Sequence, residues 1–181
     1  RVLDAGCGVG AAALCLSARV SGLTLYGLEL QPALAEVARK NAAENASAVT
    51  VIDGDLAHPP DALKRLVFDH VITNPPFFER ENHGSSLPAR DIARREGMLS
   101  LRDWLAACLR RLRQGGWLTV IHRAERLPCL LAACESRAGS ISLRPLAARE
   151  GRPAGRVVLR ARKDSRGPLR LCPPLILHDG P

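Results

Sequence analysis

The sequence predicts an α/β fold with a doubly wound, mostly parallel seven-stranded sheet and an antiparallel edge hairpin. Apolar strand-like runs alternate with helical segments five times, which is typical of a parallel sheet with helices on both faces. A glycine-rich turn follows the first run, where the backbone can approach a ligand closely. Two late apolar runs are joined by the turn at residues 151–155, which begins and ends with glycine and indicates a hairpin.

Four of the expected strands lie in the first half of the chain. The first begins at Val2 and runs into the glycine-rich turn, and a small-residue helix follows at residues 11–19. The next strands are expected at 23–29, 49–52 and 67–73. A helix at 32–45 has Pro32 in its first turn, where proline is well tolerated, and a short helix precedes the fourth strand.

The second half begins with a charged loop at residues 79–97. A helix is expected at 101–112, ended by Gly115-Gly116, because apolar residues recur on one face. That face contains Leu101, Leu105, Cys108, Leu109 and Leu112. The remaining expectations are a strand at 117–122, a helix at 126–137, the hairpin strands at 140–146 and 157–161, and an extended tail at 168–181.

The length is that of one ordinary domain, expected to span residues 1–181. Because the chain starts at Arg1, without a methionine, and enters a strand directly, we expect an N-terminal segment to be missing. Nothing resembles a signal peptide, and the apolar runs are too short to cross a bilayer. These features predict a cytoplasmic protein.

Charge is unevenly distributed along the chain. Residues 1–79 hold 6 Lys/Arg and 9 Asp/Glu, whereas residues 80–181 hold 20 and 9, a net charge of +11. A basic half favours a polyanionic partner such as nucleic acid. The alternative is a coding bias, since 23 of the 26 basic residues are arginine.

The cysteine and histidine patterns predict no metal site. None of the six cysteines forms a CxxC pair, and most lie in apolar segments, so we expect reduced, buried side chains. The five histidines are scattered along the chain.

Acidic residues follow three successive strands at the positions where a ligand would lie. Asp4 precedes the glycines of Gly6-Cys7-Gly8-Val9-Gly10 in a D-x-G-x-G-x-G pattern. Glu29 ends the second strand, and Asp55 is expected at the end of the third. The loop also satisfies the dinucleotide-binding pattern GxGxxA, but a carboxylate beside it suits a ligand with a cationic amino group better than a pyrophosphate. Glu29 could accept two ribose hydroxyls and Asp55 an adenine amine.

The fourth strand ends in Asn74-Pro75-Pro76-Phe77-Phe78. Two prolines cannot continue a sheet ladder, so the chain must leave the strand as a stiff turn. The turn offers a side-chain amide oxygen, a proline-fixed carbonyl and a flat ring. Ligands of open α/β sheets bind at this end of the strands.

Together these motifs resemble those of class I S-adenosylmethionine-dependent methyltransferases that modify a planar amino nitrogen. The loop and tail are most similar to those of the bacterial tRNA(Val) adenine N6-methyltransferase family. Four segments carry this similarity: Asn-Pro-Pro-Phe-Phe, the arginine-bearing loop, residues 122–127 and residues 171–178. The resemblance implies a Rossmann-like fold with S-adenosylmethionine as cofactor. The implied cofactor-binding residues are Asp4, Gly6, Cys7, Gly8, Gly10, Glu29, Leu30, Asp55, Leu56 and Asn74.

The resemblance also implies the roles of the turn and of the basic loop. The implied catalytic residues are Asn74, Pro75, Pro76 and Phe77. The Asn74 oxygen and the Pro75 carbonyl would accept the two amine hydrogens, and Phe77 would stack on the base. The resemblance implies an RNA substrate, and tRNA in particular. The implied substrate-binding residues are Phe77, Phe78, Arg90, Arg94 and Arg95.

Several other functions remain open from the sequence. A release-factor glutamine methyltransferase would share the Asn-Pro-Pro-aromatic turn but has less reason for the basic half. A ribosomal RNA guanine N2-methyltransferase often has histidine where Phe78 stands here. An RNA-binding module with a vestigial cofactor site would be expected to have lost some of the acidic residues. An NAD-dependent dehydrogenase leaves the Asn74 turn unexplained. The sequence does not determine the oligomeric state.

Overall fold

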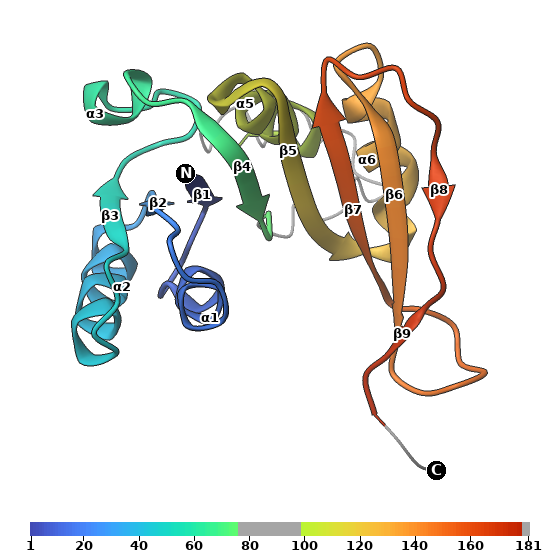
Figure 1. Cartoon of the computed structure of the whole chain (residues 1–181), viewed down its shortest axis with the longest axis horizontal. Coiled ribbons are helices and arrows are strands. Elements are labelled where there is room, and N and C mark those ends of the chain that lie inside the picture. Colours follow the sequence, from blue (N-terminus) through green and yellow to red (C-terminus); the bar gives the residue numbers. More distant parts are fainter. Residues whose placement is uncertain (76–98, 179–181) are drawn as a thin grey trace, which may run out of the picture.

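The computed structural model describes residues 1–75 and 99–178. They contain one mixed sheet with the strand order β3-β2-β1-β4-β5-β7-β6-β8, and β9 also pairs with β6 (Figure 1). The strands are β1 (Val2–Ala5), β2 (Leu25–Glu29), β3 (Thr50–Asp53), β4 (Phe68–Thr73), β5 (Leu112–Arg123), β6 (Ala138–Ala147), β7 (Arg156–Lys163), β8 (Arg170–Leu171) and β9 (Leu175–Ile176). The helices are α1 (Ala11–Arg19), α2 (Pro32–Glu44), α3 (Asp61–Lys64), α5 (Leu101–Arg111) and α6 (Leu127–Cys134), with a 3₁₀ turn at Ala124–Arg126.

The mostly parallel sheet and the hairpin are both confirmed. β1 pairs in parallel with β2 and β4, β2 with β3, and β4 with β5. β7 is antiparallel to β5 and to β6 and lies between them, so the hairpin places its second strand inside the sheet. Among the described residues nine strands are present where seven were predicted, because β8 and β9, two residues each, pair with β6 from the extended tail.

Helices cover both faces of the sheet around β1, where all four residues are buried. Asp4 accepts a hydrogen bond from the backbone of Ala13 in α1. Leu3 and Ala5 belong instead to a hydrophobic cluster that includes Leu105 of α5. Because successive strand residues point to opposite faces, α1 and α5 lie on opposite sides of the sheet. The doubly wound arrangement is therefore confirmed.

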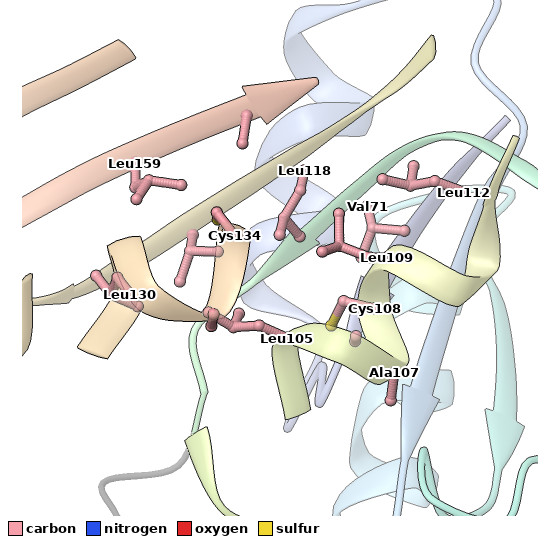
Figure 2. Packing of buried hydrophobic residues seen from close by; sticks show 14 of the residues in the cluster. Val71, Leu105, Ala107, Cys108, Leu109, Leu112, Leu118, Leu130, Cys134 and Leu159 are labelled. Carbon is pink, nitrogen blue, oxygen red and sulfur yellow. The ribbon is translucent and has the colours of Figure 1, made fainter. Parts of the chain in front are cut away.

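The hydrophobic core lies between the sheet and the helices α5 and α6. Figure 2 shows its central members, which are Leu105, Cys108 and Leu109 of α5, Leu130 and Cys134 of α6, and Val71, Leu118 and Leu159 of the sheet. Phe68 is also fully buried, and its ring meets that of Tyr26 edge-on at 5.6 Å. Burying one such leucine contributes about 1.5–3 kcal/mol, so this cluster anchors β4 and β5 beside α5.

The prediction that Gly115-Gly116 ends a helix was wrong, and so were the predicted bounds of the later helix. The helix expected at residues 101–112 ends at Arg111, and Gly115 and Gly116 lie inside β5 rather than ending the helix. Gly115 has φ +70°, and the β4–β5 register shifts between Phe68 and His70, so the glycines accommodate an irregularity in the strand. The helix expected at 126–137 is a 3₁₀ turn followed by α6, which ends at Cys134.

The six cysteines are all free thiols. Cys7, Cys108 and Cys134 are buried as expected, but Cys15 and Cys129 are exposed, so the expectation of burial was wrong for these two. Among the described residues no helix is long and apolar enough to span a membrane. The loop expected at 79–97 lies outside the described residues.

Candidate functional site

The predicted acidic residues and Asn74 lie toward the same edge of the sheet, the one formed by the carboxyl ends of the parallel strands. β1, β2, β3 and β4 are parallel neighbours, so their carboxyl ends face the same way. In register, Glu29 lies beside Asp53, and Ala5 lies beside Thr73, the residue before Asn74. The structure therefore brings the glycine turn, Glu29 and the Asn74 turn together from segments far apart in the sequence.

The glycine turn has a backbone that only glycine adopts easily. Gly6, Gly8 and Gly10 have φ values of +73°, +54° and +85°. A Cβ at Gly8 would meet nothing within 4 Å, so the space above this glycine is open to a ligand. The turn leads directly into α1, whose first-turn amides favour a negatively polarised ligand atom.

Glu29 has a structural task at this edge that the sequence did not reveal. One carboxylate oxygen accepts from the Gly8 backbone N–H at 2.8 Å, and the other from the Gln31 N–H at 3.0 Å. The side chain therefore holds the middle of the glycine turn against the end of β2. Each carboxylate oxygen has two acceptor sites, so both can still accept a hydroxyl.

Asp4 is a buried carboxyl group with an unused acceptor. It is only 4% exposed, and within the described part of the chain its Oδ2 has no hydrogen-bond partner. Burial, opposed in part by the Ala13 amide and reinforced by the charge of Glu29, raises the pKa of Asp4 to about 6. A cationic amino group beside Oδ2 would relieve this unfavourable burial. The free acceptor oxygen of Asp4 therefore fits the amino group of S-adenosylmethionine, which would donate to it.

Cys7 fills space within the turn. Its Sγ packs where a Cβ of Gly27 would lie, 2.7 Å away, and its backbone N–H donates to Leu28. Burial, together with the nearby charges of Asp4 and Glu29, raises the pKa of the Cys7 thiol to about 12. The thiol is therefore neutral at physiological pH and is no candidate nucleophile.

The third strand does not end at Asp55, as was expected from the sequence. β3 ends at Asp53, and Asp55 lies in the turn beyond it, where its Oδ1 caps the Ala57 N–H at 2.8 Å. Its Oδ2 lies 3.1 Å from His58 Nδ1. Leu56, next to it, is buried in the core cluster, whereas Leu30, which follows Glu29, is 62% exposed.

Asn74 stands at the point where β4 ends. Asn74 is exposed at this edge, whereas the neighbouring Pro75 is fully buried and anchors the start of the turn. Pro76, Phe77, Phe78, Arg90, Arg94 and Arg95 lie outside the described residues, and their predicted roles stay predictions.

Trp104 of α5 connects the Asn74 turn to the glycine turn, and sequence reasoning missed it. Its Nε1 donates to the Thr73 hydroxyl at 3.0 Å, and that hydroxyl donates to the Ala5 carbonyl at 2.7 Å. The indole ring also lies 3.0 Å from where a Gly6 Cβ would stand. Its position three residues after Leu101 signalled a helix face toward the core, but these partners come from distant strands.

The described residues contain no group of three or more His, Cys, Asp or Glu side chains that could hold a metal ion.

Comparison with known proteins agrees with this geometry. Residues 1–132 match the family model of the methyltransferase small domain. A protein of Aeromonas hydrophila named tRNA1(Val) (adenine(37)-N6)-methyltransferase is 34% identical over 168 residues, which cover 88% of this chain and 67% of the relative. A Porphyromonas gingivalis protein of the same name is 33% identical over 69% of this chain, and the match spans only half of that relative.

Solved structures give the same picture for the fold. A predicted O-methyltransferase of Agrobacterium tumefaciens superposes with a TM-score of 0.78 at 28% identity, covering 98% of this chain and 80% of that one. A Thermus thermophilus 16S rRNA N2 methyltransferase, solved with AdoMet and guanosine, superposes with a TM-score of 0.60 at 25% identity, covering 90% of this chain and 37% of that one. The chain therefore belongs to the methyltransferase small domain family, with the fold and the S-adenosylmethionine cofactor of class I methyltransferases.

Proposed function

We propose that this chain transfers a methyl group from S-adenosylmethionine to an exocyclic amine, and that the amine is N6 of adenine in tRNA. The observation that carries the proposal is the exposed Asn74 at the end of β4, on the same sheet edge as the buried, half-satisfied carboxyl group of Asp4. The Aeromonas and Porphyromonas relatives are named for this reaction. The chain spans from half to about two thirds of the length of these relatives.

The proposed cofactor contacts follow from the free acceptors at the sheet edge. Asp4 Oδ2 takes the cationic amino group, and Glu29 takes the ribose hydroxyls with the lone pairs that Gly8 and Gln31 leave unused. Asp55, with the backbone around Leu30 and Leu56, borders the adenine. The bound cofactor supplies an electrophilic methyl group on a sulfonium.

The proposed chemical role of the turn is to orient the amine. The lone pair of an exocyclic amine is delocalised into the base, so the nitrogen is planar and a weak nucleophile. When the Asn74 side-chain oxygen and the Pro75 carbonyl each accept one N–H, the nitrogen is drawn toward tetrahedral geometry and its lone pair is aimed at the methyl group. The new N–C bond would form as the bond between the methyl carbon and sulfur breaks. The electron pair of the broken bond would stay on sulfur, and one amine proton would leave to solvent.

The glutamine side chain of a release factor is the second candidate substrate. A Vibrio cholerae release factor glutamine methyltransferase is 30% identical over 67% of this chain, although the match spans only 44% of that protein. An amide nitrogen is as planar as an aromatic amine, so the same turn would serve it. The net charge of +11 on residues 80–181 favours RNA over a protein substrate.

The test is transfer of a labelled methyl group to tRNA, ribosomal RNA and a release factor in parallel, followed by nucleoside analysis. We expect N6-methyladenosine in tRNA. Asn74→Ala should lower the rate at least about 100-fold at saturating cofactor, the usual range for one preorganised polar group. Asn45→Ala, an exposed asparagine at the end of α2, is the matched control and should retain the rate. Label in the release factor or in guanine would show that the substrate is not adenine in tRNA. Full activity of Asn74→Ala would refute the role of the turn.

A further inference from the structure

Five arginines project from one face of the sheet at the end far from β3. On β7, Arg156, Arg160 and Arg162 are exposed, whereas Val157, Leu159 and Ala161 between them are buried against the core. β6 contributes Arg144, which pairs with Val158, and β8 contributes Arg170, which pairs with Ser142 opposite Arg160. Residues paired in register point to the same face. We call Arg144, Arg156, Arg160, Arg162 and Arg170 the arginine face; the strands that bear it lie side by side in Figure 1.

The opposite face of the same strands is the one covered by a helix. Leu159 and Leu143 belong to the core cluster with Leu130 and Cys134 of α6, and Figure 2 shows Leu159 near both α6 residues. The arginines, alternating with these residues, point away from α6. All five are exposed in the described structure.

The arginine face lacks neutralising acids within the described residues. Elsewhere in the described structure basic side chains form ion pairs: Arg39 with Asp53, Lys64 with Asp61, and Arg113 with Asp69. None of the five arginines forms an ion pair with a described residue. In register, the positions that share their face on β5 and β6 include Trp117, Thr119, Ile121, Arg123, Ser142 and Leu146, none of them acidic. Glu125, beyond the end of β5, pairs with Arg123 and not with any of the five arginines. An uncompensated positive surface is what a polyanion requires.

Three of the arginines are held in place by contacts that leave most of their donors available. The Arg160 guanidinium stacks over the Trp117 ring at 3.9 Å. Arg162 Nε donates to the Gly115 carbonyl at 3.0 Å, and Arg144 donates to the Pro173 carbonyl at 3.2 Å. A guanidinium has five N–H donors, so one hydrogen bond fixes the group and leaves others for an anion.

The arginine face passes close to the proposed catalytic turn. Thr73, the residue before Asn74, is level with Val120 of β5 and therefore with Leu159 of β7. Two strand spacings separate β7 from β4, or about 10 Å. Arg160 lies one residue from the level of Thr73 on one side, and Arg156 lies three residues from it, about 10 Å, on the other. A chain of phosphates along β7 would therefore pass the turn at a distance of about 10 Å.

We propose that the arginine face binds the phosphate backbone of the RNA substrate outside the target nucleotide. This inference rests on the proposed function and extends it, because it assigns the docking surface to the folded sheet, in addition to the arginines predicted at 90, 94 and 95. The face contacts phosphates, so it contributes affinity and orientation without reading sequence.

The test measures binding of a tRNA transcript to the full chain across a salt series, without turnover. The variant is Arg144→Gln/Arg156→Gln/Arg170→Gln, which spares the stacked Arg160 and the bonded Arg162. The control is Arg19→Gln/Arg65→Gln/Arg102→Gln, which removes the same charge from exposed positions on or beside three helices. We expect the variant to bind about 10- to 100-fold more weakly at about 0.1 M salt and the salt slope to fall by about two, since each phosphate contact contributes about 0.7–0.9. The control should change the slope by less than about 0.5.

Equal weakening by the variant and the control would overturn the proposal, because net charge alone would then explain binding. Unchanged RNA binding with a shift from dimer to monomer in sedimentation would assign the face to a second copy and would also overturn it. Cofactor binding and the melting temperature of each variant report retained folding. Because the assay needs no methyl transfer, failure of the arginine face is distinct from failure of the proposed reaction.

Discussion

Replacing Asp4 with asparagine should stabilise the protein and weaken its cofactor site. Desolvation raises the pKa of Asp4 from the ordinary 3.8 to about 6, a difference of about two pKa units at about 1.36 kcal/mol each. Ionised Asp4 therefore lowers the free energy of unfolding by about 3 kcal/mol at neutral pH. The asparagine side chain keeps an acceptor for the Ala13 amide and carries no charge, so the substitution removes this penalty.

The difference in free energy of unfolding between the wild type and Asp4→Asn should grow as the pH rises. A carboxyl group whose pKa is raised in the folded state binds its proton more tightly there, so the penalty is small below about pH 4, grows as the pH rises toward 6, and is complete above that value. Urea unfolding of both proteins without cofactor should give a difference of about 2–3 kcal/mol near pH 7.5 and about half of that near pH 5. Isothermal titration should show cofactor binding weakened about 10- to 100-fold in Asp4→Asn, the value of one charge-assisted hydrogen bond.

Two outcomes would refute this reasoning. A stability difference that does not change between pH 5 and pH 7.5 would mean that the charge of Asp4 is not its source. Unaltered cofactor affinity would mean that the unused Oδ2 does not face the cofactor, and the proposed role of Asp4 would be withdrawn.

Two further predictions concern the contact between Trp104 and the turns. Trp104→Phe removes the hydrogen bond to Thr73 while keeping an aromatic ring beside Gly6, so we expect methyl transfer to slow about 10-fold with little change in cofactor affinity; an unchanged rate in single-turnover kinetics would contradict a positioning role. Gly6→Ala and Gly8→Ala both place a side chain at positive φ, which costs about 1–2 kcal/mol, but only the Gly6 substitution also meets the Trp104 ring, at 3.0 Å. Gly6→Ala should therefore be the more destabilising by about 1 kcal/mol or more in urea unfolding, and Trp104→Phe should reduce that excess; equal losses for the two alanine variants would show that the ring yields freely.

Local sequence patterns determined the elements and much of the site. Apolar runs of strand length and helical periodicity depend on neighbours in the chain, so the alternation of β1 to β5 with helices could be predicted closely. The glycine turn and the acidic residues were predictable because parallel strands end at one edge of a sheet. The assigned roles of Asp4, Glu29, Asp55 and Asn74 remain predictions.

The features that the sequence did not predict depend on pairing between distant strands. Gly115-Gly116 looked like a helix end because glycine usually interrupts helices and strands alike. In the folded chain Leu112 pairs with Phe68, and Trp117 pairs with both His70 and Arg162. These pairs on either side of the glycines keep them within the strand despite their low intrinsic preference. Pairing of β8 and β9 with β6 was equally invisible, because two residues carry no periodicity.

Only the tertiary structure decided which distant residues meet. It inserted β7 between β5 and β6, and thereby aligned arginines from β6, β7 and β8 on one face. It also used both oxygens of Glu29 to hold the chain around the glycine turn, and placed Trp104 between Thr73 and Gly6. A sequence pattern encodes the type of element through interactions over a few residues. Strand order, register and burial depend on contacts between segments tens of residues apart, and these become defined only when the core closes.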